Sequence, residues 1–322
     1  MIKVAIIGMG NVAWSAHLPV LLSRNDIEIS WVFDKSQNKK NILKKKNIPF
    51  FNDIKNAINY KKCDIALITI PYSERAKIFD EIKDKFSGIF FEKPFALTLD
   101  QHEYFSNHYE DYAVTIGYQR RHMGIVKTLK NIINQNIFGP LISININFGD
   151  IHYKFDGFRS KKEKSGGGIF FEAGSHWIDT VLFVTDAKNI KNFKSDKKEI
   201  AELDIECSGA FDIVNKHSHE INCNFYISNL NNTSNSIEFN FKHCSLELSL
   251  FDDNSSLKII NNGDHEFIIK DNEFYNFPNK SLDVLWSFWN EFLYSYKNKK
   301  KSEISADNFV LTTKIIELFY AK

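Results

Sequence analysis

The fold of the N-terminal part is decided by the stretch KVAIIGMGNVA, residues 3–13. The apolar run Lys3–Ile7 predicts a buried strand, and a turn with the spacing GxGxxA follows it at once. Gly8 permits a tight turn, and Gly10 lets the backbone approach a pyrophosphate closely. Ala13 stands where a third glycine often sits and still allows a helix to pack on the strand. This context predicts a dinucleotide-binding turn, with the pyrophosphate on the N-terminus of the next helix.

The second apolar run ends in an acid at the offset expected for a ribose-binding residue. Strand Ile27–Phe33 leads into Asp34, whose carboxylate would accept hydrogen bonds from both ribose hydroxyls of the cofactor. It would also repel a 2′-phosphate, so the sequence favours NAD over NADP. Lys35 and Lys39 lie close enough to weaken this discrimination, and NADP stays an alternative.

Short apolar runs and amphipathic segments alternate through the first part of the chain. This alternation predicts a doubly wound parallel sheet, a Rossmann fold of the α/β class. We therefore expect residues 1–120 to form an NAD(P)-binding domain. The expected strands are Lys3–Ile7, Ile27–Phe33, Ile65–Ile70, Gly88–Phe91 and Ala113–Ile116, and the expected helices are Ala13–Leu22, Lys39–Lys46, Glu74–Lys85 and Leu99–Asn107.

After Gly117 the pattern changes to longer alternating runs separated by polar turns. It predicts an α+β domain over residues 121–322, with a large, mainly antiparallel open sheet and helices on one face. The last helices, near 281–296 and 306–320, could pack back on the first domain. The broad, flat face of the sheet suggests a homodimer or homotetramer formed through it. The other expected strands are Leu141–Ile151, Glu202–Val214, His219–Ser228, Ser236–Lys242, Ser245–Leu250, Leu257–Ile260 and Glu266–Ile269, and the other helices are Gly124–Gln135 and Phe171–Phe183.

Composition limits the classes of partner. The 322 residues carry a formal net charge of +1 at pH 7, which gives no broad field to attract nucleic acid or an anionic membrane. No apolar stretch approaches the roughly 20 residues of a membrane span, and the N-terminus does not resemble a signal peptide. The four cysteines are scattered, without metal-binding spacing. We expect a cytoplasmic protein with reduced cysteines and a small-molecule ligand, and neither nucleic acid nor a membrane as partner.

The segment Glu92-Lys93-Pro94 ends a late strand of the first domain, and five other motifs accompany it. They are Ala16-His17-Leu18-Pro19, Thr69-Ile70-Pro71, Gly117-Tyr118-Gln119-Arg120-Arg121, Gly166-Gly167-Gly168 and Gly174-Ser175-His176-Trp177-Ile178-Asp179. Together these motifs resemble the Gfo/Idh/MocA oxidoreductase family over nearly the whole chain. The resemblance implies a metal-free, nicotinamide-dependent site. The expected cofactor contacts are Gly8, Gly10, Asn11, Val12, Asp34, Thr69, Pro71, Glu92, Lys93 and Gln119.

Lys93 is the first candidate for a catalytic residue. The proline that follows it biases Lys93 to an extended conformation, which projects it from the end of the strand. Its ammonium group could donate to a substrate hydroxyl or carbonyl oxygen and stabilise negative charge as it develops. Without this context, a lysine in a loop is nearly always a plain surface residue.

A second catalytic group is expected on the helix after the glycine triplet. Glu172, His176 and Asp179 stand at i, i+4 and i+7 and so share a helix face. The histidine titrates near neutrality and suits proton transfer with a hydroxyl that becomes a carbonyl. Glu172 could orient it or relay the proton, and the glycines would let the backbone approach a ligand or the cofactor. A structural helix with a salt-bridged histidine and a metal site are the alternatives.

Two positions depart from the family pattern. The family commonly has aspartate where Glu172 stands, and one extra methylene exceeds the tolerance of about 0.5 Å in catalytic geometry. It often has histidine where Arg75 stands. Arg75 is a fixed cation that cannot shuttle protons, so it could bind an anionic group or lie at the surface. The expected substrate-binding residues are Lys93, Arg121, Tyr153, Arg159, His176 and Asp179, with structural ion pairs or hydrogen bonds as the alternative for Arg121, Tyr153 and Arg159.

The sequence thus predicts an NAD-dependent oxidoreductase. It would transfer hydride to or from a secondary alcohol or ketone of a sugar, a cyclitol or a nucleotide-linked sugar, with Lys93, His176 and Glu172 as catalytic residues. One alternative is a non-catalytic dinucleotide-binding sensor of the same fold that regulates a partner protein. Another is a reductase of an imine or a linear tetrapyrrole. The sequence does not define the substrate or the direction of reaction.

Overall fold

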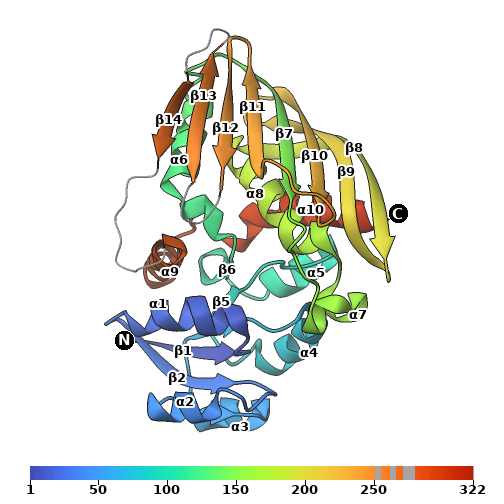
Figure 1. The fold of residues 1–322 in the computed structure, drawn as a ribbon. Coiled ribbons are helices and arrows are strands. Elements are labelled where there is room, and N and C mark those ends of the chain that lie inside the picture. The colour runs from blue at the N-terminus through green and yellow to red at the C-terminus, as the bar shows by residue number, and fades with distance from the viewer. Residues whose placement is uncertain (251–254, 262–265, 271–279, 322) are drawn as a thin grey trace. The chain divides into compact units, whose positions relative to one another are not determined.

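The computed structural model describes residues 1–250, 255–261, 266–270 and 280–321. The chain divides into two compact units. Unit 1 comprises Met1–Gly117 and Ser281–Val310, and unit 2 comprises Tyr118–Lys280 and Leu311–Lys322. Figure 1 shows the helices and strands of both units, coloured along the chain.

Unit 1 is built on a six-stranded parallel sheet in the order β3-β2-β1-β4-β5-β6. The strand order reverses between β1 and β4, which is the switch point of a doubly wound sheet. Every residue of β4 and β5 is buried, as expected for central strands with helices on both faces. The predicted Rossmann fold is confirmed. The strands are β1 (Ile2–Ile7), β2 (Ile27–Phe33), β3 (Phe50–Phe51), β4 (Ile65–Ile68), β5 (Gly88–Phe91) and β6 (Val114–Ile116).

The helices of unit 1 lie between these strands in the chain. The first begins with a π-helical turn, η1, where the sequence predicted a plain α-helix, and such turns occur frequently at functional sites. The helices are η1 (Ala13–His17), α1 (Leu18–Leu22), α2 (Lys40–Lys45), α3 (Ile54–Tyr60), α4 (Tyr72–Ile82), α5 (Leu99–Ser106) and η2 (Asp111–Ala113).

A segment from near the C-terminus completes unit 1. Helix α9 (Lys280–Asn298) places Phe288, Trp289 and Phe292 against Phe90 of β5. Beyond it, η6 (Ala306–Phe309) is held to α5, since the ring of His102 lies 3.1 Å from the Ala306 carbonyl oxygen. Burial lowers the pKa of His102 to about 4, so at neutral pH this ring is uncharged and donates its hydrogen to that carbonyl. The core of the Rossmann sheet therefore depends on residues far along the chain.

Unit 2 is built on an eight-stranded sheet in the order β14-β13-β12-β11-β7-β10-β9-β8. All neighbours are antiparallel except β7 and β10, which are parallel, so the predicted mainly antiparallel sheet is confirmed. Its strands are β7 (Leu141–Gly149), β8 (Ala187–Ile200), β9 (Leu203–Asn215), β10 (Glu220–Ser228), β11 (Ser236–Phe241), β12 (Cys244–Ser249), β13 (Ser256–Asn261) and β14 (Glu266–Lys270).

One face of this sheet is apolar and carries helices. The ring of Phe148 on β7 contacts Trp177, and Phe225 on β10 contacts Phe170, which in turn stacks on Phe319. The helices of unit 2 are η3 (Gln119–His122), α6 (Gly124–Asn134), η4 (Gly157–Ser160), α7 (Lys162–Ser165), η5 (Phe170–Gly174), α8 (Ser175–Val184) and α10 (Val310–Tyr320). The core of unit 2 thus lies between the sheet and helices of one face.

The opposite face of the sheet is polar. The side-chain amide of Asn224 donates to Asn145 at 3.1 Å, and that of Asn145 donates to Glu238 at 3.0 Å. Asn222 likewise donates to Asp212 at 3.1 Å. These hydrogen bonds link side chains of β9, β10, β7 and β11 across the outer surface. The face is therefore a polar surface with hydrogen bonds between neighbouring strands.

Strand β8 is the main element that the sequence did not predict. Its sequence AKNIKNFKSDKKEI has few apolar residues, and most of its side chains are exposed. It lies at the edge of the sheet, where lysine side chains protect unpaired backbone groups from other chains. Such a strand has no apolar periodicity from which it could be predicted. The short elements β3 and α3 were also not predicted.

Candidate functional site

Four turns of unit 1 lie at one edge of its sheet. Each follows the carboxyl end of a strand, and these strands, β2, β1, β4 and β5, are consecutive neighbours; the turns begin at Asp34, Gly8, Thr69 and Glu92. Folds of this type bind ligands at the carboxyl edge, beside the switch point. The structure therefore brings together predicted cofactor residues that are distant in the chain.

The glycine turn is held against the turn after β4. Gly8 has a φ of +99°, and a Cβ at this residue would lie 2.8 Å from the Thr69 carbonyl oxygen. The Thr69 hydroxyl donates to the Gly8 carbonyl oxygen at 2.7 Å. A Cβ on Gly10, in contrast, would meet nothing within 4 Å. The open space beside Gly10 fits a pyrophosphate that approaches the backbone there.

Asp34 faces the glycine turn. One of its carboxylate oxygens accepts the Met9 N–H at 2.5 Å, and the other accepts the Ser36 N–H at 2.7 Å. The side chain remains partly exposed, so its free lone pairs can accept further hydrogen bonds. This is the arrangement that a ribose-binding carboxylate needs.

Two lysines follow Asp34, and each has a partner within unit 1. Lys35 Nζ lies 2.5 Å from Glu74 Oε2, and Lys39 Nζ lies 4.5 Å from the ring centroid of Trp14. Exposed contacts of this kind are worth about 1 kcal/mol or less. Neither cation is committed to its partner, so NADP stays an alternative to NAD.

The remaining predicted cofactor contacts differ in their surroundings. Asn11 and Val12 are exposed at the start of the helical run that includes η1, and Pro71 is the N-cap residue of α4. Gln119 belongs to unit 2, and its buried amide oxygen has no hydrogen-bond partner among the residues that the structure describes. Buried polar atoms are nearly always paired, and the predicted contact of Gln119 with the cofactor stays a prediction.

The Lys93 turn is held through the neighbouring Glu92. The carboxylate of Glu92 is buried, with one oxygen 2.8 Å from His17 Nε2 and the other accepting the Lys93 N–H at 3.2 Å. A Cβ on Gly117 would lie 2.7 Å from the same carboxylate, so only glycine leaves room for it. Lys93 itself is half-buried, and the peptide bond between Lys93 and Pro94 is cis. Glu92 thus holds the turn that carries the lysine, and its predicted contact with the cofactor stays a prediction.

Arg75 is buried and braces the other side of this turn. Its guanidinium donates to the carbonyl oxygen of Pro94 and, at 3.1 Å, to that of Phe95. The interpretation of Arg75 as a surface residue is therefore wrong. The fixed fork geometry of arginine suits two adjacent carbonyl oxygens.

The glycine triplet of unit 2 serves close packing within that unit. A Cβ on Gly168 would lie 2.0 Å from the Asp204 carbonyl oxygen, and one on Gly167 would lie 2.3 Å from the Tyr320 hydroxyl. The carboxylate of Asp204 accepts the Gly168 and Phe170 N–H groups at 2.7 Å each, and the Tyr320 hydroxyl at 2.7 Å. Burial raises the pKa of Asp204. This carboxylate holds the start of the predicted catalytic helix.

The predicted catalytic helix begins as the π-helix η5 and continues as α8. Glu172 lies in η5 with Oε2 3.5 Å from Arg159 Nε, and His176 lies in α8. His176 is partly buried, and its ring meets that of Tyr118 edge-on, with centroids 5.7 Å apart. Burial raises the pKa of Tyr153, and the nearby Glu172 carboxylate adds to the rise. Tyr153, Arg159 and Glu172 therefore form one group within unit 2.

Asp179 and Arg121 pair with each other. Arg121 donates to the two carboxylate oxygens of Asp179 at 2.9 and 2.6 Å, and the Thr312 hydroxyl donates to one of them at 3.0 Å. Both members of the pair are buried. Their predicted contact with substrate stays a prediction, while the pair has an evident role in holding η3, α8 and α10 together.

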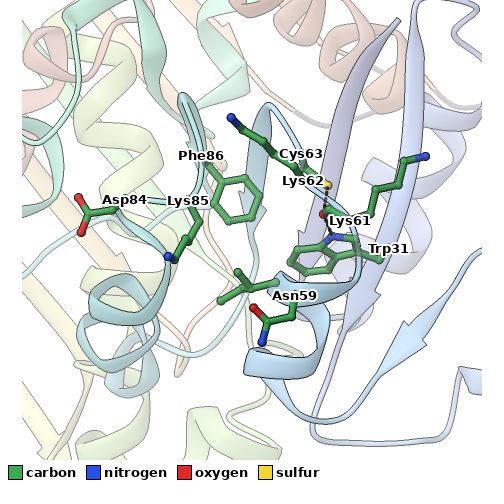
Figure 2. Close-up of a pocket in the computed structure, with 9 residues that line it drawn as sticks. Trp31, Asn59, Lys61, Lys62, Cys63, Asp84, Lys85 and Phe86 are labelled. Carbon is green, nitrogen blue, oxygen red and sulfur yellow. Dashed lines mark hydrogen bonds between the residues drawn. The ribbon is translucent and has the colours of Figure 1, made fainter.

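A pocket lies at the other edge of the sheet in unit 1. Figure 2 shows its lining, which comprises Trp31, Ile58, Asn59, Lys61, Lys62, Cys63, Asp84, Lys85 and Phe86. Residues 61–63 and 84–86 precede β4 and β5, so the pocket is at the amino ends of these strands and away from the glycine turn. Burial raises the pKa of the Cys63 thiol to about 11, and a protonated thiol is a poor nucleophile.

The part of the chain that the structure describes contains neither a metal-binding cluster nor a membrane-spanning helix. Within 1–250, 255–261, 266–270 and 280–321, no three His, Cys, Asp or Glu side chains gather closely enough to hold a metal ion. In that part of the chain, no helix has both the length and the apolar character needed to cross a membrane. The four cysteines are free and buried.

Family models match most of the chain. The model described as oxidoreductase family, NAD-binding Rossmann fold, matches residues 2–118, and the GFO/IDH/MocA C-terminal domain matches residues 126–247. The chain belongs to the Gfo/Idh/MocA oxidoreductase family. Unit 1 accordingly carries the NAD-binding Rossmann domain of this family, as the motifs predicted.

Individual relatives are distant. Glucose-6-phosphate 3-dehydrogenase of Bacillus subtilis is 26% identical over 199 residues, which are 58% of this chain and 55% of that protein. The match thus spans about half the length of this curated relative. A 3-ketoreductase from Actinomadura kijaniata, solved with NADP and TDP-benzene, is 14% identical with a TM-score of 0.77, covering 99% of this chain and 96% of that one. A super-repressor mutant of Gal80p from Saccharomyces cerevisiae is 14% identical with a TM-score of 0.76, covering 99% of this chain. These two structures share the fold.

Three residues of the site were missed or left without a role by sequence reasoning. His17 stood within a recognised motif, but only the structure pairs it with Glu92. Asp204 and Trp289 had no signal, because each is an ordinary strand or helix residue whose partner lies far away in the chain. The only local indication of such a residue is a polar side chain at a position where the spacing predicts a buried apolar one, because a buried polar group needs a partner.

The buried Arg121–Asp179 pair yields a stability prediction. Replacing Arg121 with methionine leaves the carboxylate of Asp179 buried without its main partner, which is expected to cost about 3–5 kcal/mol of unfolding free energy. Equilibrium denaturation in urea measures it. The matched control is Lys191→Met, which removes the exposed pair with Glu220 and should change stability little. An Arg121 variant as stable as the control would show that the pair does not support the fold.

Proposed function

We propose that this protein is an NAD-dependent oxidoreductase that transfers hydride to or from a secondary alcohol or ketone of a sugar, a cyclitol or a nucleotide-linked sugar. Residues 1–120 would bind the cofactor, and residues 121–322 would bind the substrate. The glucose-6-phosphate 3-dehydrogenase relative and the 3-ketoreductase supply the precedent for a sugar substrate.

One observation carries the proposal. Asp34, the glycine turn and the Lys93 turn lie at the same edge of one sheet, after neighbouring strands. The carboxylate suits the ribose and the open backbone at Gly10 suits the pyrophosphate. A dinucleotide bound in this way has its nicotinamide end on the side of β4 and β5, where Lys93 stands. A lysine there has a role in chemistry that a cofactor-binding site alone would not need.

Each predicted site residue would have its own role in the hydride transfer. Bound NAD would supply the hydride acceptor or donor. Lys93 would donate a hydrogen bond to the substrate oxygen and stabilise charge that develops on it. His176 would accept the hydroxyl proton as the alcohol becomes a ketone, and would return it in the reverse direction. Glu172, with Arg159 beside it, would orient the histidine or the substrate; Tyr153 would contribute its hydroxyl.

The first prediction from this proposed function concerns Lys93. The Lys93→Ala variant should lose about 10²–10³-fold in kcat, since it removes a group that stabilises developing charge, while its affinity for NAD changes little. Nicotinamide absorbance measures turnover, and quenching of protein fluorescence measures NAD binding. Lys85→Ala is the matched control, because Lys85 is an exposed lysine that precedes the same strand.

Incubating the protein with NAD, with NADP and with a panel of sugars, cyclitols and sugar nucleotides tests the class of function. Turnover that depends on Lys93 supports the oxidoreductase. Tight NAD binding without turnover on any substrate, together with a co-purifying protein, would instead favour the sensor. Near-normal turnover in Lys93→Ala would contradict the mechanism.

The second prediction concerns the choice of cofactor. Asp34→Asn keeps an oxygen for the Met9 N–H but loses the charge that favours ribose hydroxyls and repels a 2′-phosphate. Charge-assisted hydrogen bonds contribute roughly 1.5–3 kcal/mol, so the preference for NAD over NADP should fall by about 10-fold or more. Dissociation constants for both nucleotides measure it. An unchanged preference would show that Asp34 does not read the ribose.

We also propose that the protein assembles as a homodimer or homotetramer through the outer face of the sheet in unit 2. This face is polar, and Asn224 on β10 is exposed and hydrogen-bonded to Asn145 of the neighbouring strand β7. Light scattering should give two or four times the mass of one chain. Asn224→Lys, which places unpaired charge on the face, should reduce that mass. A wild-type mass equal to one chain would contradict the proposal.

A cytoplasmic location is part of the same proposal. The free, buried state of all four cysteines is compatible with a reducing compartment, and cell fractionation would test it.

A further inference from the structure

A chain of hydrogen bonds in unit 1 links helix α9 to the Lys93 turn. The indole Nε1–H of Trp289 donates to Nδ1 of His17 at 3.0 Å, and Nε2 of His17 lies 2.8 Å from Glu92 Oε1. The other oxygen of Glu92 accepts the Lys93 N–H at 3.2 Å. Trp289 and His17 are fully buried, and Glu92 is 6% exposed. Water therefore cannot substitute easily for any member of the chain.

The tryptophan at one end of this chain of hydrogen bonds can only donate, and this determines the tautomer of His17. An indole N–H can only donate, so Nδ1 of His17 must accept and carries no hydrogen. A carboxylate can only accept, so Nε2 must carry the hydrogen that it donates to Glu92. His17 is thus held as the neutral Nε2–H tautomer. Without the tryptophan donor, Nδ1 would be a buried acceptor with no partner, which is costly.

Packing around Trp289, His17 and Glu92 keeps their hydrogen bonds in place. The ring of Phe90 stacks on Trp289 with centroids 4.6 Å apart and meets His17 edge-on at 5.1 Å. On the other side, the space beside the Glu92 carboxylate is limited by Gly117. The carboxylate can therefore move little. Beyond Lys93, the guanidinium of Arg75 holds the carbonyl oxygens of Pro94 and Phe95, so the turn is fixed at both ends.

We infer that Trp289 and His17 are positioning residues: they hold the Glu92 carboxylate, and through it the Lys93 backbone, in the geometry that the reaction needs. Neither residue would touch substrate or cofactor. The effect on catalysis rests on the proposed role of Lys93, whereas the tautomer of His17 and the order of the turn do not. A displacement of about 1 Å in a catalytic group can cost about 10²-fold in rate, which is why a distant indole can matter for turnover.

Trp289→Phe tests this inference directly. Phenylalanine preserves an aromatic ring beside Phe90 and removes the indole donor. We expect kcat to fall about 10- to 100-fold, with KM for NAD changed less than about three-fold. The ¹⁵N signals of His17 should show Nδ1 without hydrogen and Nε2 with hydrogen in the wild type. In the variant they should show a mixture of tautomers or a protonated ring. The Lys93 amide should exchange with solvent faster.

Trp286→Phe is the matched control. Trp286 lies on the same helix and is partly exposed, and the guanidinium of Arg24 lies over its ring at 5.0 Å. It takes no part in the chain of hydrogen bonds, so this variant should leave kcat and the His17 signals unchanged. An equal loss of kcat in both variants would overturn the inference, because it would show only a weakened helix.

Two variants of His17 provide a second test. A glutamine amide can accept from Trp289 and donate to Glu92, whereas leucine can do neither. His17→Gln should therefore retain more turnover and a slower exchange of the Lys93 amide than His17→Leu. Equal behaviour of the two would contradict the inference.

Failure of the proposed function is distinguishable from failure of this inference. If the wild type turns over no substrate, the His17 signals and the Lys93 amide exchange still report on the hydrogen bonds between Trp289, His17, Glu92 and Lys93. If Trp289→Phe keeps a single Nε2–H tautomer of His17 and an unchanged exchange rate of the Lys93 amide, the positioning role is overturned, whatever the enzyme assays show.

Discussion

The carboxylate of Glu92 is the interaction on which the site in unit 1 depends. It is buried, and burial of a charged group is tolerated only where hydrogen bonds satisfy it. His17 from the first helix and the Lys93 N–H supply these bonds, and Gly117 after β6 supplies the space. One carboxylate therefore ties the first helix and the turns after β5 and β6 to each other. Three of the motifs noted in the sequence therefore meet at one contact, through His17, Glu92 and Gly117.

A buried carboxylate plays a similar part in unit 2. Asp204 on β9 accepts the N–H groups of Gly168 and Phe170, which begin the helix that carries Glu172 and His176. The glycine triplet is needed because the backbone approaches Asp204 and Tyr320 too closely for a Cβ. In both units, then, a buried carboxylate holds backbone next to the residues expected to perform chemistry. In unit 1 it is Glu92 of the same turn as Lys93, and in unit 2 it is Asp204 of β9. Such support from neighbouring residues is what a precise site requires.

The sequence was sufficient for the fold and for the NAD-binding class of the first domain, while the individual cofactor contacts stay predictions. The glycine turn, the alternating periods and the Glu92-Lys93-Pro94 segment depend on local sequence, and local rules could detect them. The strand β8 escaped detection because its charged edge carries no apolar period, and the roles of His17, Asp204 and Trp289 escaped because they arise from contacts between distant segments. The buried placement of Arg75 was missed for the same reason, since its partners are backbone carbonyl oxygens. The predicted roles of Glu172, His176 and the substrate residues stay predictions. The fold alone cannot decide them, since a repressor shares it.

The central claim is that the glycine turn, Asp34 and the Lys93 turn form one dinucleotide site. A crystal structure of the protein with NAD bound tests this most directly. We expect the pyrophosphate on the backbone at Gly10, the adenine-side ribose hydroxyls on the Asp34 carboxylate, and the nicotinamide ring beside the Lys93 side chain. A nucleotide bound at another place, or bound with its nicotinamide directed away from Lys93, would contradict it.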